Sequence, residues 1–270
     1  MIHTLSTLIA VALYGAALIT LLSGLRGRIE MRRGERLAFG LALPAVLIQA
    51  ILLWQAVWTT AGLNLSLFNA ASLLGWLMAA MLLVAAIRQP VHSLGVVVFP
   101  FAAVTLLLAD RFGTPGTTMV PLGEPVDLHV ISSVAAYAVL GLASAQAVVL
   151  AWQENVLRRR RAGAVLGLLP PLQSMEALLF QLLAIGFVLL SISLVTGWLF
   201  VDNLFAQDLV HKTVLSMVAW LVFAGLLIGR HQAGWRGRTA IRWTLAGILL
   251  LALAYFGSKT VLELILSRPA

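Results

Sequence analysis

Two histidines stand where imidazole side chains could bind an iron ion. His129 and His211 each open a long apolar segment, the fifth and the seventh of the chain, so both lie on one side of a membrane at a similar depth. Two imidazoles at one level of a helical bundle can ligate iron from opposite faces. The spacing leaves a second interpretation open, in which both are interfacial histidines that hydrogen-bond to loops.

A stripe of polar and small residues runs inward from His129. Ser133 and Tyr137 follow at intervals of four residues, which places the three side chains on one face of a helix. Hydroxyl-bearing and small side chains also let membrane helices pack closely and bond to one another. The stripe therefore predicts either one wall of a cofactor site or a helix-packing face.

Lys259 is an unusual charge inside the last apolar segment, and Glu263 follows one helical turn later. An ion pair between these two side chains, or extension of the amine to the membrane surface, would be a structural explanation. Alternatively, the amine offers a positive charge to an anionic ligand such as a carboxylate. Arg111 and Lys212 are further candidates for that second role, and both interpretations stand at this point.

The composition shows what kind of element must position these side chains. Of the 270 residues, 61% are hydrophobic and 10% are charged, and the mean hydropathy is +1.01. Soluble domains average roughly 45–50% apolar and about 25% charged residues. Soluble enzymes, disordered chains and nucleic-acid-binding domains are therefore excluded, despite the net charge of +8. The absence of cysteine excludes disulfides, thiolate metal sites and covalent thiol chemistry.

Eight segments reach the length of about 20 mostly apolar residues that a transmembrane helix needs. Their runs are continuously apolar rather than alternating, which predicts helices and not a membrane β-barrel. We expect an all-α, polytopic helical bundle that forms a single membrane domain over residues 1–270, with the third and fourth spans joined as a hairpin at Pro90. The expected spans are about 3–24, 37–60, 66–87, 91–109, 128–152, 176–200, 211–229 and 240–264.

The basic residues predict the orientation of the chain. The loops on one side carry 14 basic and four acidic residues, a net of +10, and the other side has −2, which together make +8. Cytoplasmic loops carry the excess of Lys and Arg, so both termini are expected on the non-cytoplasmic side. Five of the arginines are expected in the loop after the first span, namely Arg26, Arg28, Arg32, Arg33 and Arg36.

The inner loop before the sixth span contains no recognisable site. Ser174 there is expected to cap the sixth helix, with Glu176 in the first turn favoured by the helix dipole. Elsewhere the chain has no Gly-rich phosphate loop, no His-Glu-x-x-His zinc helix and no Gly-x-Ser-x-Gly elbow. We therefore expect neither enzymatic activity nor a nucleic-acid partner.

Several short motifs follow one another in a recognisable order: Asn64-Leu65-Ser66-Leu67-Phe68-Asn69; Leu128-His129-Val130 through Ala136-Tyr137-Ala138; Leu169-Pro170-Pro171-Leu172; Met217-Val218-Ala219-Trp220-Leu221-Val222-Phe223; Gly234-Trp235-Arg236-Gly237-Arg238; and Ala254-Tyr255-Phe256-Gly257-Ser258-Lys259. This ordered set spans nearly the whole chain. It resembles the cytochrome c assembly protein family (the CcsA/CcmC group), particularly its shorter HemX/YpjD-like branch.

The resemblance implies a bacterial inner-membrane protein that handles haem during the maturation of c-type cytochromes, with outward histidines that ligate the haem iron. His129 matches the first of these histidines. Two family features are missing: the tryptophan-rich outer loop, since residues 200–213 contain no tryptophan, and the histidine after the Phe-Gly motif of the eighth helix. His211 lies near the missing loop and is our candidate for the second axial ligand.

Two functions are then open. In the leading hypothesis the protein binds or handles haem in or beside cytochrome c assembly, with iron ligands His129 and His211, Tyr137 lining the site, and Lys259 or Arg111 near the propionates. Because the chain has no thiol, other membrane or cytochrome-assembly proteins would have to attach the haem. In the alternative the protein is a cofactor-free accessory or regulatory subunit that acts through helix contacts. A transporter of another small anion is a weaker third option.

Overall fold

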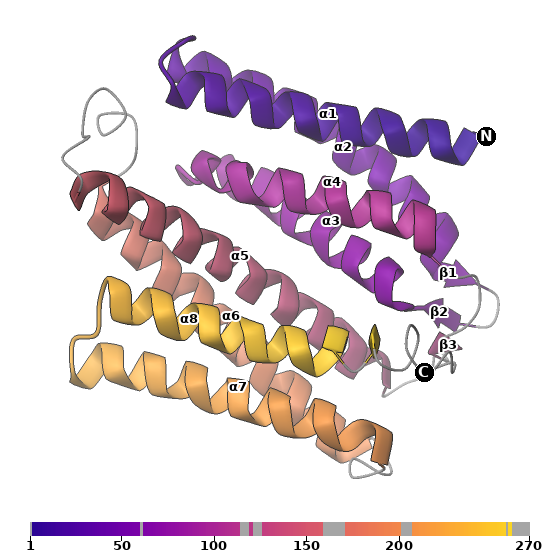
Figure 1. Ribbon diagram of the computed structural model, residues 1–270. Coiled ribbons are helices and arrows are strands. Elements are labelled where there is room, and N and C mark those ends of the chain that lie inside the picture. The colour runs from indigo at the N-terminus through magenta and orange to yellow at the C-terminus, as the bar shows by residue number, and fades with distance from the viewer. Residues whose placement is uncertain are drawn as a thin grey trace. The chain divides into compact units, whose positions relative to one another are not determined.

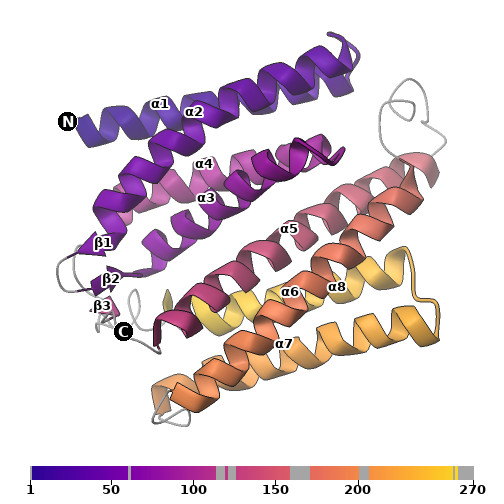
Figure 2. The same cartoon turned by 180° about the vertical axis from the view of Figure 1, so that it is seen from behind.

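Eight long apolar helices make up the computed structural model of the protein (Figure 1, Figure 2). The structure describes residues 2–59, 62–113, 119–120, 126–158, 171–200, 207–257 and 259–260. Within these ranges eight helices are long and apolar enough to cross a membrane, which confirms the predicted all-α, polytopic class. The chain divides into two compact units: unit 1 is Met1–Met119 with Trp152–Leu172, and unit 2 is Val120–Ala151 with Gln173–Ala270. The single membrane domain stays a prediction.

Unit 1 is built on four helices: α1 (Ile2–Leu25), α2 (Met31–Val57), α3 (Leu67–Ala86) and α4 (Gly95–Phe112). A single 3-10 turn, η1 (His92–Leu94), leads into α4. Three short strands form a small sheet in the order β1 (Trp58–Thr59), β2 (Gly62–Asn64) and β3 (Met119–Val120), with Trp58 opposite Leu63. The direct passage from α3 through η1 to α4 confirms the predicted helical hairpin at Pro90.

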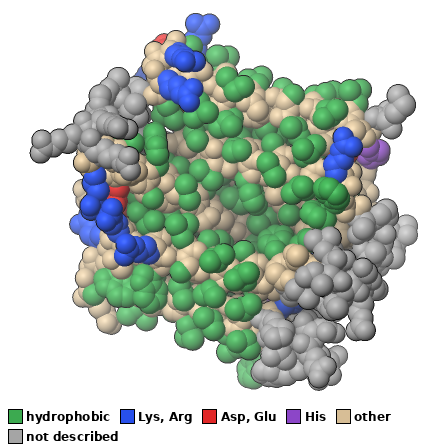
Figure 3. All heavy atoms as spheres, viewed as in Figure 1, with side chains coloured by type: hydrophobic (Ala, Val, Ile, Leu, Met, Phe, Trp, Pro, Cys, Tyr) green, Lys and Arg blue, Asp and Glu red, His purple; other side chains and the backbone are tan. Residues whose placement is uncertain are grey.

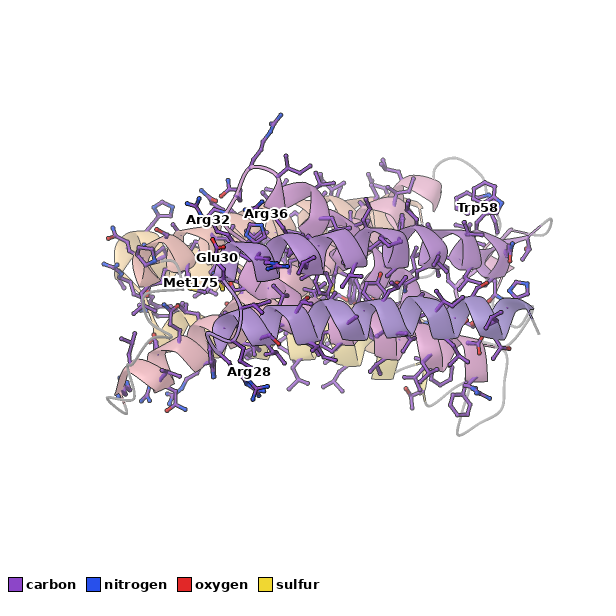
Figure 4. The ribbon with its side chains drawn as sticks, turned by 90° about the horizontal axis from the view of Figure 1, so that it is seen from above. Arg28, Glu30, Arg32, Arg36, Trp58 and Met175 are labelled. Atoms are coloured by element: carbon purple, nitrogen blue, oxygen red, sulfur yellow. The ribbon has the colours of Figure 1, made fainter. Side chains whose placement is uncertain are left out.

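The two ends of unit 1 are chemically different. At one end, the turn after α1 contains Gly27, whose φ of 68° suits a residue without Cβ. At the same end, His92 Nδ1 lies 3.8 Å from Glu35 Oε1. At the other end, Thr7 Oγ1 donates to Asp110 Oδ1 at 2.9 Å. Figure 4 shows Arg28, Glu30, Arg32 and Arg36 where α1 ends and α2 begins, and Trp58 at the opposite end of α2.

A polar contact links three helices inside unit 1. Tyr14 on α1 donates its hydroxyl to Gln49 Oε1 on α2 at 2.8 Å, and Gln49 Nε2 donates to Ser72 Oγ on α3 at 3.1 Å. All three side chains are fully buried. Hydrogen bonds across membrane helices satisfy polar groups that hydrocarbon cannot. The contact therefore pairs specific faces of α1, α2 and α3.

Unit 2 contains α5 (Val126–Arg158), which belongs to this unit up to Ala151, together with α6 (Leu172–Phe200), α7 (Gln207–Gln232) and α8 (Arg238–Ala252). The last of these helices, α8, continues as a π-helix, η2 (Leu253–Gly257). The start of α6 meets the α7–α8 turn through Glu176, which accepts from Arg236 Nε at 3.1 Å and from the Gly237 N–H at 2.8 Å. Trp220 on α7 donates its indole N–H to Ser191 Oγ on α6 at 2.8 Å.

Several helix boundaries differ from the prediction, and two of them change how predicted residues are assigned. The second helix begins at Met31, so Arg32, Arg33 and Arg36 lie on α2 and not in a loop. The sixth begins at Leu172, so Ser174 lies inside α6 instead of capping it. Apolar length locates the part of a helix that lies in hydrocarbon, whereas helices continue into the headgroup layer with polar residues. This explains why charged helix ends were assigned to loops.

The last span also departs from the prediction, because its α-helical part ends at Ala252 and π-helical winding follows. Residues 261–270, and with them the predicted partner Glu263, lie outside the described part of the chain. A π-helical segment changes which residues face the neighbouring helices, and hydropathy does not reveal it.

Large apolar side chains are exposed along the flanks of the helices. In unit 1, Ile51 is 60% and Val84 68% exposed, and in unit 2 Ile131 is 66% exposed. Figure 3 shows hydrophobic side chains across the face in view and Lys and Arg side chains toward its edges. Soluble monomers rarely expose apolar patches beyond a few hundred Å². The flanks are therefore surfaces for lipid.

Candidate functional site

His129 is held near the start of α5 by the backbone of α6. Its Nδ1 lies 2.9 Å from the carbonyl oxygen of Ser193. A carbonyl oxygen only accepts hydrogen bonds, so Nδ1 must carry the proton in this contact. In the neutral ring, Nε2 then holds the lone pair. Histidines that ligate metals usually donate their other ring N–H in this way, which fixes the tautomer and the ring orientation.

The imidazole also packs against a glycine on α6. A Cβ at Gly197 would lie 3.0 Å from His129 Cε1 and 3.2 Å from Nδ1, closer than ordinary contact. Any larger residue at this position would have to displace the ring or the helix. The glycine and the Ser193 carbonyl are four residues apart on one face of α6, and together they set the position of the imidazole.

Hydroxyl groups surround the same contact. Ser133 Oγ donates to the His129 carbonyl at 2.6 Å and lies 2.6 Å from Ser193 Oγ. Thr196 Oγ1 lies within hydrogen-bonding distance of the Ser193 carbonyl, at 3.1 Å. Part of the polar stripe on α5 therefore faces a matching polar stripe on α6, and hydrogen bonds join the two helices at the level of His129.

Tyr137 and Lys259 belong to a second group of contacts, between α5 and the end of the eighth helix. The Tyr137 hydroxyl donates to the carbonyl of Leu251 at 2.9 Å, and its ring meets the Tyr255 ring edge-on with centroids 6.0 Å apart. Lys259 Nζ lies 5.3 Å from the centroid of the Tyr255 ring and the residue is only 5% exposed. Tyr255 thus contacts both predicted site residues.

Helix geometry places Lys259 at the level of His129. Glu176 bonds the start of α6 to the start of α8, and His129 bonds the start of α5 to the end of α6. The helix α8 therefore runs in the same direction as α6, toward the end at which His129 lies. His129 and Lys259 are each eight residues from the bonded pair Tyr137 and Leu251. Both therefore lie further toward the same end, and at about 1.5 Å per α-helical residue His129 is roughly 12 Å beyond the pair. The rise to Lys259 is smaller, because residues 253–257 are π-helical.

The structure assigns the two remaining predicted site residues, Arg111 and His211, to their helices. Arg111 is exposed in the last turn of α4, in unit 1. His211 belongs to α7, but its side chain lies outside the described residues. Among the described residues, no group of three or more His, Cys, Asp or Glu side chains could hold a bare metal ion.

Of the residues that contact His129, Tyr137 and Lys259, Ser193 and Gly197 are recognisable in the sequence by their small size, whereas Tyr255 is not. Ser193 and Gly197 are small residues of the sixth span, a type that lets membrane helices pack closely, but nothing in the sequence pairs them with His129. Tyr255 was visible only within a family motif, since its contacts depend on the π-helical turn at residues 253–257. Sequence reasoning also assigned Glu176 to its own helix, whereas it bonds to the α7–α8 turn.

Eight lipid-exposed helices and a histidine fixed between two of them define a polytopic helical membrane protein. The profile of the cytochrome C assembly protein family matches residues 39–266. The chain is 34% identical over 261 residues to the inner membrane protein YpjD of Escherichia coli K12, covering 96% of this chain and 98% of that one. The chain belongs to the cytochrome c assembly protein family and is an integral inner-membrane protein.

Similarity to other relatives is more limited. A 28.8 kDa protein of Azospirillum brasilense is 34% identical over 158 residues, covering 58% of this chain and 56% of that one. The cytochrome c biogenesis protein CcsA of Prochlorococcus marinus is 25% identical over 87 residues, covering 32% of this chain and 27% of its own length. No solved structure matches the chain.

Proposed function

We propose that the protein binds haem and acts in or beside cytochrome c assembly, without catalysing a reaction of its own. The observation that carries the proposal is the hydrogen bond from His129 Nδ1 to the Ser193 carbonyl at 2.9 Å. It leaves Nε2 as the lone-pair nitrogen and holds the ring against rotation, which is the arrangement of an axial haem ligand. Membership in the cytochrome c assembly protein family supports the same cofactor.

The residues present fit a haem group chemically. His129 would hold the haem through its imidazole nitrogen, and the haem would supply an iron centre. Lys259 offers a positive charge at the level of His129, suited to a propionate, and Tyr137 and Tyr255 supply aromatic surface between them. We propose His211 as the second axial ligand and Arg111 as a further propionate contact. These two assignments rest on the sequence.

The chain's own residues limit what it does with the haem. It has no cysteine, so it forms no thioether bond to a haem vinyl group, and covalent attachment belongs to other proteins. The bilayer is one partner, and other membrane or cytochrome-assembly proteins are the expected recipients or donors of the haem. His129 would bind and orient the haem, and the hydrogen bond between the hydroxyls of Ser133 and Ser193 maintains the α5–α6 contact that positions His129.

Absorption spectroscopy of the purified protein tests the proposal. The wild-type chain in detergent, expressed with added haem precursor, should show a Soret band that shifts on reduction. His129→Ala should abolish or strongly shift the band, and His211→Ala should convert six-coordinate to five-coordinate haem. A wild-type chain without a Soret band would rule out haem binding. A band that His129→Ala leaves unchanged would rule out His129 as the ligand.

A cofactor-free accessory subunit is the second candidate. It is favoured by the absence of tryptophan from residues 200–213, where the family resemblance implies a tryptophan-rich loop. In that case the hydrogen bond between His129 and Ser193 is a helix-packing contact. His129→Ala would then lower stability and partner binding in a protein whose spectrum shows no haem at any stage.

A further inference from the structure

Unit 1 carries a set of arginines whose charges the chain leaves unpaired. The arginine cluster consists of Arg26, Arg28, Arg32, Arg33 and Arg36, all exposed around the α1–α2 turn. In the described part of the chain, none of these guanidinium groups hydrogen-bonds or forms an ion pair with another protein group. Figure 4 shows Arg28, Arg32 and Arg36 projecting at this end of α1 and α2.

The neighbouring carboxylates do not neutralise the cluster. Glu35 faces His92, whose Nδ1 lies 3.8 Å from its Oε1. Glu30 precedes α2 and makes no side-chain cap for it. Arg32 and Arg36 are four residues apart on one helix, a spacing at which like charges repel, and they lie at the helix end where the dipole disfavours cations. An anion from outside the chain would relieve both effects.

The start of α8 offers an internal comparison, because it is equally basic but already has its anion. Arg238 and Arg242 are exposed there with the same spacing of four residues. At that helix start, however, Glu176 accepts hydrogen bonds from the Gly237 N–H and from Arg236. Among the described residues, a buried carboxylate is therefore supplied to one basic helix start and none to the other.

The rest of α2 matches a lipid bilayer in length and polarity. From the arginines, exposed apolar side chains continue along one side of the helix, namely Leu37, Leu43, Leu47 and Ile51. They lead to the exposed indoles of Trp54 and Trp58, which are stacked with centroids 4.9 Å apart. The 27 residues of α2 span about 40 Å, which equals a bilayer with its headgroups. The cluster therefore lies at headgroup depth, beside a surface for acyl chains.

We propose that the arginine cluster binds the phosphate headgroup of an anionic phospholipid in the leaflet at this end of unit 1. Guanidinium groups bind phosphate oxygens in pairs of parallel hydrogen bonds. Exposed leucines on α2 contact the acyl chains of the same lipid. The site is independent of the haem proposal, because it involves none of the residues around His129.

Native mass spectrometry of the full chain tests the proposal. The detergent-purified protein is titrated with phosphatidylglycerol, and separately with phosphatidylcholine of identical acyl chains. Arg32→Gln together with Arg36→Gln should weaken phosphatidylglycerol binding by about tenfold or more, given that each basic residue near a membrane surface contributes about 1 kcal/mol. The matched control, Arg238→Gln with Arg242→Gln, should change it less than about threefold.

Equal losses in the two double variants would overturn the proposal, because charge number alone would then explain binding. Equal affinity of the wild-type chain for the two lipids would overturn it as well. That wild-type comparison needs no variant, so it decides the matter even if Arg32→Gln with Arg36→Gln fails to fold.

Discussion

The His129 ring owes its position to two features of α6 that involve no side-chain functional group. One is the main-chain carbonyl of Ser193, and the other is the missing Cβ of Gly197. A backbone acceptor cannot be removed by substitution, so the tautomer of His129 is robust to changes at Ser193. The position of the His129 ring would, in contrast, change if a single methyl group were added at Gly197.

Gly197→Ala is therefore expected to disturb the imidazole without removing it. The added Cβ would lie 3.0 Å from His129 Cε1, and relieving such overlap in a packed site costs about 1–3 kcal/mol. Haem affinity, measured by titrating the apoprotein and following the Soret band, should fall about tenfold or more.

Gly15→Ala is the matched control, because a Cβ there meets nothing within 4 Å. It should leave haem affinity unchanged. If Gly197→Ala bound haem as the wild type does, with the same Soret maximum, the ring would not be positioned by this contact.

Buried polar contacts hold particular helix faces together within each unit. In unit 1, Gln49 is the hydrogen-bond acceptor of the Tyr14 hydroxyl. In unit 2 the Glu176 carboxylate joins α6 to the first residues of α8. Both contacts bridge helices that are separated in sequence, so each is a point where one substitution loosens an interface.

Gln49→Leu should destabilise unit 1 by about 1–3 kcal/mol, because it leaves a buried Tyr14 hydroxyl without its acceptor. Adding Tyr14→Phe should recover part of the loss, since it removes the unpaired Tyr14 hydroxyl, while Ser72 Oγ still lacks the donor that Gln49 supplied. The free energies of unfolding in detergent, measured for both single variants and the double variant, give the coupling. Strictly additive losses would mean that the hydrogen bond does not stabilise the fold.

Glu176→Ala should lower the free energy of unfolding by about 1.5–3 kcal/mol, the range for hydrogen bonds to a charged group. It removes the acceptor of the Gly237 N–H and of Arg236 at the α7–α8 turn. Glu154→Ala is a suitable control, because Glu154 makes no hydrogen bond or ion pair among the described residues. It should change stability by less than about 0.5 kcal/mol. Similar losses in both variants would contradict the role of Glu176.

For the whole molecule, the distribution of charge predicts how the chain lies in the membrane. In unit 1 the arginines of the α1–α2 turn lie at the same end as the α3–α4 turn, because His92 at the start of η1 faces Glu35. In unit 2 the basic α7–α8 turn lies at the start of α6. Within each unit, basic residues therefore gather at one end, as the positive-inside rule requires.

A reporter fused after Ala270 should accordingly read as external, and one inserted in residues 159–170 as cytoplasmic. Both results follow from eight crossings with the basic loops inside. An alkaline phosphatase and a fluorescent protein fusion at each site would make the measurement, since one is active outside and the other inside. A cytoplasmic signal after Ala270 would refute the orientation or the number of crossings.

The sequence alone was sufficient for the architecture, including eight helices, the hairpin at Pro90 and the family. Hydrophobic length is a local property, and about 20 apolar residues in a row have one stable form in lipid, because the backbone must satisfy its own hydrogen bonds there. It was also sufficient for choosing His129, Tyr137 and Lys259 as residues to examine, since polar groups are rare inside the spans.

Only the tertiary structure decided what those residues contact. Helices that are apolar on every side show no amphipathic pattern that would tell which faces meet, so Ser193, 64 positions from His129, was not identifiable as its partner. The same holds for Glu176 and Gly237, 61 positions apart, and for the π-helical turn that brings Tyr255 between Tyr137 and Lys259. In lipid, close packing and hydrogen bonding select helix partners, and both depend on atoms that meet only in the folded bundle.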